Sequence, residues 1–303
     1  MTPMPAATPL AGIYPYLVSP VDAATGAILE RPLRALVEHL IEQGVHGVSP
    51  LGSTGEFAYL DRAQKAEIIR IVVDQAGGRV PVVPGVASFS TVDAQHQADQ
   101  AAQLGADGIV LMLQAFFPVP PAGVLGYFTA VADSSPLTIC LYANPGLTVD
   151  LPPPLVDELS HLETVRYFKE ASGNTGRILT VMNLVGDRMQ MFSASAHIPL
   201  VVFQLGGVGW MAGPACLMPK ACVRLWELCQ AGRWEDALGL QRKLWRLNEV
   251  FQRYSLAACV KTGLQLQGFD VGDPLPPQTP LPADAVADIR SALDLQAQLD
   301  AEL

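Results

Sequence analysis

Short apolar runs alternate with helical patterns along most of this sequence, and this alternation strongly limits the folds it can adopt. Eight such runs fill residues 10 to about 230: "GIYPYLVSP", "GVHGVSPLG", "VPVVPGVA", "GIVLML", "LTICLYANP", "TVRYFKEAS", "MQMFSAS" and "GVGWMAG". Segments between them, such as "RPLRALVEHLIEQG" and "DRAQKAEIIRIVVDQAGG", repeat apolar residues at i, i+3 and i+4 and end at glycine. Strands that are apolar throughout are typical of parallel sheets covered by helices. The sequence therefore predicts an α/β fold, a (β/α)8 TIM barrel over residues 1–230.

The last part of the chain, residues 231–303, carries helical patterns without further apolar runs between them. Its clearest helical stretch is "RWEDALGLQRKLWRLNEVFQR", and a proline-rich break follows at "GDPLPPQTPLP". We expect a C-terminal helical segment that packs on the barrel.

Charge and hydropathy limit the kinds of molecule that this chain can bind. The formal net charge is −10 at pH 7, and Lys and Arg form no cluster, which argues against a nucleic-acid surface and favours small-molecule partners. Apolar runs such as "GIVLML" are too short to cross a bilayer, and the start "MTPMPAATPLAG" lacks the basic and apolar regions of a signal peptide. We therefore expect no membrane partner and a cytoplasmic location.

The cysteines and histidines indicate no metal centre. The five cysteines include no C-x-x-C pair, and the five histidines do not supply the close spacing of a zinc site. We expect reduced, buried thiols at Cys140, Cys216, Cys222, Cys229 and Cys259.

Lys169 is one of five lysines in 303 residues, and it stands where the sixth apolar run passes into the turn sequence E-A-S-G-N. In TIM barrels the chemistry lies at the C-terminal ends of the strands. An amine flanked there by apolar residues is partly desolvated and becomes a candidate nucleophile. Two other interpretations are a side chain that extends from the strand end to solvent and a lysine paired with Glu170.

Two further strand ends carry groups that match such an amine. In "PLGSTGEF", Gly52 and Gly55 bracket Ser53 and Thr54, whose hydroxyl and backbone N–H groups can hold a carboxylate. The same motif can also be a simple glycine turn. In "LYANPG", Tyr142 supplies either a phenol at the site or a core aromatic ring. An anion cradle, a phenol and an amine are together the set needed to make a Schiff base from a 2-oxo acid.

The motifs "GSTGE", "YANP" and "KEASGN", in this order and spacing, resemble the dihydrodipicolinate synthase/N-acetylneuraminate lyase family. The likeness extends from about residue 10 to the tail motif "VKTGLQLQGFDVGDP". It implies a class I aldolase barrel with a helical C-terminal segment, usually assembled as a homotetramer of two dimers. It also implies no metal or organic cofactor, because the protonated imine is itself the electron sink.

The resemblance also implies roles for individual residues. Lys169 matches the lysine that condenses with the ketone of pyruvate or a related 2-oxo acid. Tyr142 matches the phenol that shuttles protons during imine formation and C–C bond cleavage or formation. Ser53 and Thr54 match the hydroxyl pair that contacts the substrate carboxylate and hydrogen-bonds the tyrosine, and Gly52 belongs to the same substrate-binding turn.

Departures from the family pattern predict that the lysine-biosynthetic reaction is not this chain's activity. Dihydrodipicolinate synthases carry an arginine shortly after the active tyrosine to hold the carboxylate of the aldehyde substrate, whereas this chain has Leu147. Their second, proton-relaying tyrosine from a neighbouring subunit is replaced here by Phe116 or Phe117. The histidines of lysine-inhibited members are replaced by Arg62 and Lys65.

The sialic acid lyase branch is equally disfavoured. That branch grips a sugar polyol with acidic and hydroxyl groups after the seventh strand, where this chain reads "SASAHIP". Each unpaired polyol hydroxyl would cost about 1–3 kcal/mol in an apolar pocket. We expect Met211, after the eighth run, to contact substrate, and the substrate's distal arm to be received by an apolar set: Leu147, Phe116, Phe117, Ala196, His197 and Trp210.

Asn144 is a polar group two residues after Tyr142. It can shape the turn before Pro145. It can also hydrogen-bond the substrate or an attacking water.

Two classes of function follow. The first is a Schiff-base lyase, with an aldolase or hydratase-aldolase favoured and a 2-keto-3-deoxy-acid dehydratase as an alternative. The second is a non-catalytic barrel that binds 2-oxo acids or small amines. The joint presence of Lys169, Tyr142 and the Ser53–Thr54 pair favours the enzyme, since a sensor does not need the nucleophile.

Overall fold

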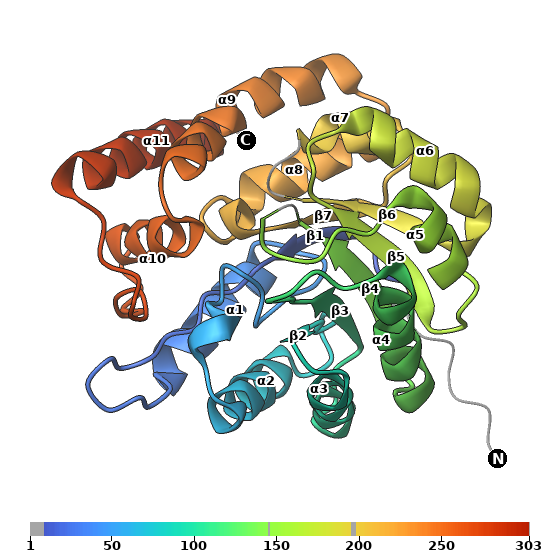
Figure 1. The fold of residues 1–303 in the computed structure, drawn as a ribbon. Coiled ribbons are helices and arrows are strands. Elements are labelled where there is room, and N and C mark those ends of the chain that lie inside the picture. Colours follow the sequence, from blue (N-terminus) through green and yellow to red (C-terminus); the bar gives the residue numbers. More distant parts are fainter. Residues whose placement is uncertain (1–8, 145, 195–197, 303) are drawn as a thin grey trace.

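The computed structural model describes residues 9–144, 146–194 and 198–302. Seven parallel strands form one curled sheet in the order β1-β7-β6-β5-β4-β3-β2 (Figure 1). The α/β prediction is thereby confirmed. The strands are β1 (Gly12–Pro15), β2 (Gly85–Ser88), β3 (Gly108–Leu113), β4 (Thr138–Ala143), β5 (Val165–Glu170), β6 (Gln190–Ser193) and β7 (Gly209–Ala212).

Helices surround the sheet on its outer side (Figure 1). They are α1 (Glu30–Glu42), α2 (Arg62–Ala76), α3 (Thr91–Gln103), α4 (Pro121–Ser134), α5 (Pro153–Leu159), α6 (Thr175–Val185), α7 (Pro199–Gln204) and α8 (Pro219–Gln230). Three short 3₁₀ turns accompany them: η1 (Phe57–Tyr59), η2 (Gly186–Arg188) and η3 (Gly213–Cys216). The helices expected between the first, second and third apolar runs are α1 and α2.

The second apolar run differs from the prediction, because it forms isolated bridges and not a strand. Val48 bridges Val82, just before β2, and Ser49 bridges Tyr16, just after β1, both in parallel. The extended stretch is short since Pro50 has no N–H to donate and Leu51 adopts a φ of 63°, which turns the chain. Residues 46–50 therefore lie between the two edge strands and are hydrogen-bonded to both sides.

The two faces of the sheet belong to two different hydrophobic clusters. Successive strand residues point to opposite faces. On β4, Leu141 joins the large cluster that includes the helices, whereas Cys140 and Tyr142 join a smaller cluster that contains no helical residue. On β7, Trp210 belongs to the first cluster and Met211 to the second. This alternation decides which side chains can reach a site inside the curl of the sheet.

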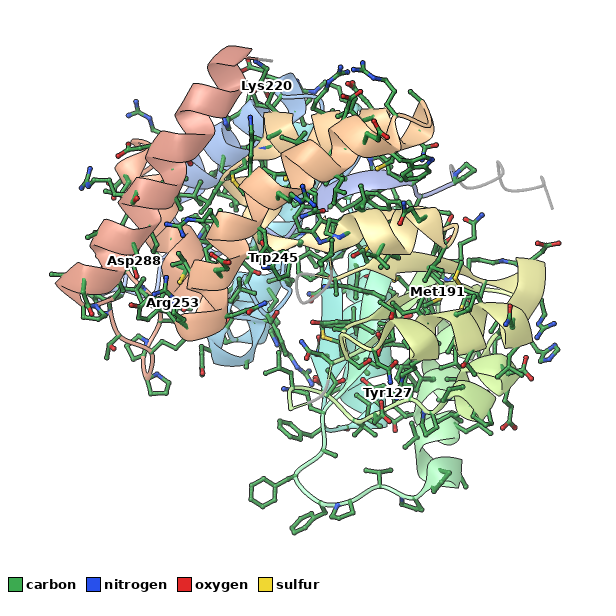
Figure 2. All side chains as sticks on the ribbon, turned by 90° about the horizontal axis from the view of Figure 1, so that it is seen from above. Tyr127, Met191, Lys220, Trp245, Arg253 and Asp288 are labelled. Carbon is green, nitrogen blue, oxygen red and sulfur yellow. The ribbon has the colours of Figure 1, made fainter. Side chains whose placement is uncertain are left out.

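The C-terminal part is helical, as predicted, and consists of α9 (Trp234–Arg253), α10 (Leu256–Leu266) and α11 (Ala283–Glu302). These helices lie together beside the sheet, at the orange-to-red end of the chain in Figure 1. Helix α9 packs on α8 and α11. Arg253 and Asp288 form an ion pair at 3.1 Å that joins α9 to α11 (Figure 2). The proline-rich break lies between α10 and α11, and α8 ends at Gln230.

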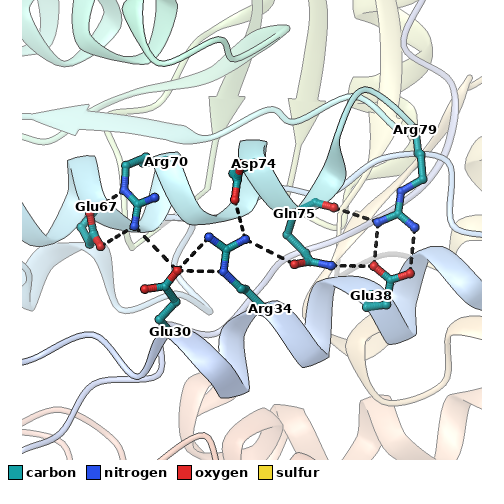
Figure 3. A network of polar contacts seen from close by, with 8 residues as sticks. All are labelled: Glu30, Arg34, Glu38, Glu67, Arg70, Asp74, Gln75 and Arg79. Carbon is teal, nitrogen blue, oxygen red and sulfur yellow. Dashed lines mark hydrogen bonds and ion pairs between the residues drawn. The ribbon is translucent and has the colours of Figure 1, made fainter.

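Helices α1 and α2 carry a network of ion pairs on their outward side (Figure 3). Arg34 contacts both Glu30 and Asp74 at 2.7 Å, and Arg79 contacts Glu38 at 2.6 Å. Exposed pairs of this kind contribute only about 0–1 kcal/mol each. The apolar side of α1, which is fully buried, contributes more to holding the helix on the sheet.

All five cysteines are buried and free, as expected. Among the helices that the structure describes, none has both the length and the apolar character required to span a membrane.

Candidate active site

Lys169 lies near the C-terminal end of β5, paired with Tyr142 on β4 and with Phe192 on β6. Its side chain is only 1% exposed. The Nζ atom lies 3.7 Å from the ring centroid of Tyr16 and 4.1 Å from that of Tyr142. The amine is therefore held between two aromatic faces inside the curl of the sheet.

Neither alternative interpretation of Lys169 agrees with this placement. A side chain so deeply buried does not extend to solvent. Glu170, the next residue on the strand, points to the other face, and its Oε1 lies 3.4 Å from Nε of Arg177. The same oxygen accepts the backbone N–H of Ser172 at 2.9 Å.

Burial changes the acid–base behaviour of Lys169. Desolvation lowers the pKa of its amine to about 7, with the nearby thiol of Cys140 acting weakly in the opposite sense. A lysine in water has a pKa of about 10.4 and is almost wholly protonated at neutral pH. Here a large fraction of the amine is neutral, and therefore nucleophilic, near pH 7.

Tyr142 presents its phenol next to this amine. Its hydroxyl oxygen accepts a hydrogen bond from Nδ2 of Asn144 at 2.7 Å. Burial raises the pKa of Tyr142 to about 12, while hydrogen bonds with Asn144 and Ser53 act in the lowering direction. The phenol is thus protonated at neutral pH and can donate a proton. Asn144 also takes part in the turn that follows, because its carbonyl accepts the N–H groups of Leu147 and Thr148, both at 3.0 Å. Its contact with the phenol is a further role that the sequence does not indicate.

The turn after residues 46–50 owes its glycines to close packing against the chain around β1. A Cβ atom on Gly52 would lie 2.7 Å from the ring of Tyr16, and one on Gly55 would lie 2.9 Å from the carbonyl oxygen of Leu17. The turn is closed by the N–H of Gly55, which donates to the carbonyl of Gly52 at 3.0 Å. Any larger residue at either position would push the turn away from the amine.

Ser53 and Thr54 differ in what they can reach. Ser53 borders the cavity that contains Lys169. Thr54 is fully buried, and its Oγ1 has no hydrogen-bond partner in the described part of the chain. Within that same part, no backbone carbonyl accepts the N–H groups of Ser53 and Thr54.

A cavity of about 330 Å³ opens over these groups. Lys169, Tyr142, Asn144 and Ser53 border it together. Sequence reasoning missed several other side chains that border it, among them four from the C-terminal helical part: Phe57, Tyr59, Met112, Gln114, Thr148, Ser255, Leu256, Ala257 and Gln278. It also missed the ring of Tyr16 beneath the amine.

The distal pocket expected from the sequence includes residues of β7 that do not border the observed cavity. Leu147 borders the cavity, whereas Trp210 and Met211 do not. Trp210 points to the helix-covered face, where its indole N–H donates to the carbonyl of Ala194 at 3.1 Å. Met211 points inward but is fully covered by neighbouring core residues. The difference arises because adjacent strand residues face opposite sides of a sheet.

Phe116 and Phe117 also lie away from the cavity. They belong to the loop between β3 and α4, which projects from the body of the molecule (Figure 2). Their side chains are 84% and 75% exposed and pack edge to face with ring centroids 5.1 Å apart. They border a separate groove. Ala196 and His197, the other expected members of the distal pocket, lie outside the described residues.

Comparison with known proteins shows the family to which this chain belongs. Residues 9–296 match the model of the dihydrodipicolinate synthetase family. This chain belongs to that family. It is 31% identical over 264 residues to the 4-hydroxy-tetrahydrodipicolinate synthase of Methanospirillum hungatei, an alignment that covers 86% of this chain and 90% of the relative. The corresponding synthase of Trichlorobacter lovleyi is 34% identical over 83% of this chain and 87% of its own length.

Solved structures of dihydrodipicolinate synthetase family members share the fold. The 4-hydroxy-tetrahydrodipicolinate synthase of Methylacidiphilum fumariolicum SolV has a TM-score of 0.92 and 26% identity, covering 97% of this chain and 98% of that chain. A prophage protein of the family from E. coli K12, solved in complex with pyruvate, has a TM-score of 0.89 and 27% identity, covering 95% and 98%. As a member of this family of lyases, the chain is an enzyme.

No three His, Cys, Asp or Glu side chains of the described ranges come close enough together to hold a metal ion. The polar groups nearest the reacting centre of this dihydrodipicolinate synthetase family member are the amine of Lys169, the phenol of Tyr142, the amide of Asn144 and the hydroxyl of Ser53.

The pKa of Lys169 predicts a pH dependence. Because the amine must be neutral to attack a carbonyl, kcat/KM for a 2-oxo acid should rise with pH through a midpoint near 7 and then level off. Tyr142, with a pKa of about 12, should cause no fall in the same neutral range. The measurement is the pH profile of the rate of borohydride-trapped adduct formation. A midpoint near 10 would show that Lys169 is solvated when it reacts.

Proposed function

We propose that this family member is a Schiff-base lyase that acts on pyruvate or a related 2-oxo acid through an imine with Lys169. The observation that carries the proposal is the buried amine, whose pKa is near neutral and which lies beside a hydrogen-bonded phenol. The Ser53 turn adds a hydroxyl and backbone N–H groups next to the same cavity.

The proposed reaction begins when the neutral amine of Lys169 adds to the ketone carbon, while the Ser53 turn holds the substrate carboxylate. The phenol of Tyr142 then gives its proton to the hydroxyl that leaves as water, and a protonated imine forms. The imine withdraws electrons from the adjacent carbon, so a C–C bond can break or form there. Hydrogen bonds from Asn144 and Ser53 stabilise the transient phenolate of Tyr142, which is reprotonated when it removes a proton from the carbon next to the imine and leaves an enamine.

The cavity supports a substrate whose second end is uncharged. Apart from Lys169, the charged side chain among the described residues that border it is Glu56, which is already paired with Lys261 at 2.6 Å. Among the described residues that border the cavity, no unpaired cation other than Lys169 is present for a second carboxylate, and Leu147 stands where dihydrodipicolinate synthases have an arginine. Ser255 is hydrogen-bonded to Gln278, so part of the polar lining is already satisfied. We therefore favour an aldolase or hydratase-aldolase whose aldehyde carries an apolar or aromatic arm.

A panel of aldehydes and 2-oxo acids tests this assignment. Condensation of pyruvate with aspartate semialdehyde should be slow or absent, because its carboxylate would be desolvated without a partner. Aromatic and alkyl members should exceed sugar acids in kcat/KM. Each assay is repeated with Lys169→Ala, so that turnover without the imine is subtracted. Robust condensation with aspartate semialdehyde, or a clear preference for sialic or hexose-derived acids, would contradict the proposed substrate class.

We further propose that the curled sheet closes as a (β/α)8 barrel, with residues 46–50 in the place of the eighth strand and the helical part beginning after residue 230. The bridges of Val48 and Ser49 to both edges support closure.

We propose a homotetramer in which a second copy covers Phe116 and Phe117, since these exposed rings form an apolar surface. Five unpaired, buried thiols agree with a reducing cytoplasm.

A further inference from the structure

Glu56 and Lys261 form a fully buried ion pair outside the set of reacting groups. Glu56 ends the G-S-T-G-E motif, and Lys261 lies in α10 of the C-terminal part. Their side chains are both 0% exposed, and Nζ of Lys261 lies 2.6 Å from Oε2 of Glu56. Removing two charges from water costs free energy, and contacts close to the pair must offset this cost.

The pair is completed by hydrogen bonds from a third segment. The other carboxylate oxygen of Glu56 accepts the backbone N–H of Leu275 at 2.6 Å and Nε2 of Gln278 at 3.4 Å. The ammonium of Lys261 donates to the carbonyl of Asp273 at 2.8 Å. Three segments far apart in the sequence are thus tied at one point: the turn that ends at Glu56, helix α10, and residues 273–278.

Both ends of this network reach the cavity. Ser53 borders it and precedes Glu56 by three residues, and the N–H of Glu56 donates to the carbonyl of Ser53 at 3.2 Å. On the opposite side, Gln278 borders the cavity and is hydrogen-bonded to Ser255, which borders it as well. A displacement of the ion pair would therefore move both the carboxylate-binding turn and the C-terminal wall of the cavity.

The backbone of the turn is held in an unfavourable conformation. Glu56 has a φ of 54° and Leu51 a φ of 63°, values in the left-handed region that residues with a side chain rarely adopt. Such conformations persist only where the surrounding contacts impose them. For Glu56 those contacts are Lys261, Leu275 and Gln278.

We propose that Glu56 and Lys261 are positioning residues for substrate binding: their ion pair fixes the Ser53 turn so that its hydroxyl and N–H groups receive the 2-oxo acid carboxylate. The inference rests on the proposed function of that turn. The C-terminal helical part is then required for substrate recognition in addition to packing. Lys169 keeps its contacts with the rings of Tyr16 and Tyr142, so the nucleophilic amine is retained when the pair is changed.

The test compares single variants with a double variant that carries no buried charge. Lys261→Met leaves the charge of Glu56 buried without its partner, and Glu56→Gln leaves the charge of Lys261 buried without its partner. Each single variant should therefore lower Tm. In Glu56→Gln/Lys261→Met both charges are absent, and Tm should recover most of this loss. Arg79→Met, which removes an exposed ion pair between Glu38 of α1 and the turn after α2, serves as the control and should change neither Tm nor binding appreciably.

The deciding readout is the pyruvate concentration that gives half-maximal borohydride trapping on Lys169. In the double variant this concentration should stay raised by roughly 10- to 100-fold although Tm recovers, because a small displacement of a binding group is costly. The pH midpoint of trapping should remain near 7. If half-maximal trapping returned to the unmodified value together with Tm, or if the double variant failed to fold, the pair would be structural only and the proposal would be overturned. A lack of any adduct on Lys169 in the unmodified protein would instead contradict the proposed function itself.

Discussion

Lys169→Ala should abolish turnover, with a loss in kcat on the order of 10⁴–10⁶, the range observed when a group at the centre of covalent catalysis is removed. The substitution deletes the amine that the structure holds between Tyr16 and Tyr142. Borohydride treatment of the unmodified protein with pyruvate should add a reduced three-carbon adduct to one lysine, and peptide mapping should place it at Lys169.

Lys65→Ala is the matched control for this experiment, because Lys65 is only partly buried and does not border the cavity. It should keep both turnover and the adduct. An adduct on a different lysine, or undiminished labelling of Lys169→Ala, would remove the proposed mechanism.

Tyr142→Phe should lower kcat by about 10²–10⁴, the usual contribution of a well-placed general acid–base. The ring continues to pack over Nζ of Lys169, so the fold and pyruvate binding should be little changed, while the proton carrier is lost. The measurement is single-turnover imine formation together with steady-state kcat. Tyr127→Phe is the control, since it also removes a buried hydroxyl, which donates to the carbonyl of Met112 at 2.8 Å, while Tyr127 itself does not border the Lys169 cavity. Unchanged turnover of Tyr142→Phe would show that water carries the proton.

The placement of Lys169 and Tyr142 could be predicted because it depends on local sequence signals. An apolar run predicts a buried strand, a turn sequence marks its end, and parallel strands bring their C-terminal ends to one edge. The helices α1, α2 and α9 followed in the same way from apolar spacing and from flanking glycine and proline residues. The sequence predicts a full strand for the second apolar run, but Pro50 and Leu51 end its pairing after two bridges.

The distal part of the site could not be predicted as well, because it depends on the face to which each residue points. The sequence analysis assigns Trp210 and Met211 to the same site. The two side chains point to opposite faces of the sheet, because a shift of one residue along a strand reverses the face. The alternation of side chains assigns Tyr142 and Lys169 each to one face of its own strand. Only the register between β4 and β5 shows that the two side chains are neighbours on the same face.

The contribution of the C-terminal helices was missed for another reason. Ser255, Lys261 and Gln278 reach the site region through contacts between distant parts of the chain, and no local pattern encodes such contacts. One signal was available for Lys261, a charged residue inside the otherwise apolar helical stretch "LAACVKTGL". Since a buried cation needs a partner, this position already implied a carboxylate opposite it.

The division of the cavity wall between two parts of the chain bears on how this enzyme could be redesigned. Lys169 and Tyr142 stand on strands inside a rigid sheet, whereas Leu147, Ser255 and Leu256 come from a loop and from the first turn of α10. Substitutions on the second group leave the strand pairing untouched. In the proposed mechanism, the groups that form the imine and the surface that meets the acceptor are therefore separable. Libraries confined to Leu147 and residues 255–257 should sample new aldehydes while the proposed imine chemistry is kept.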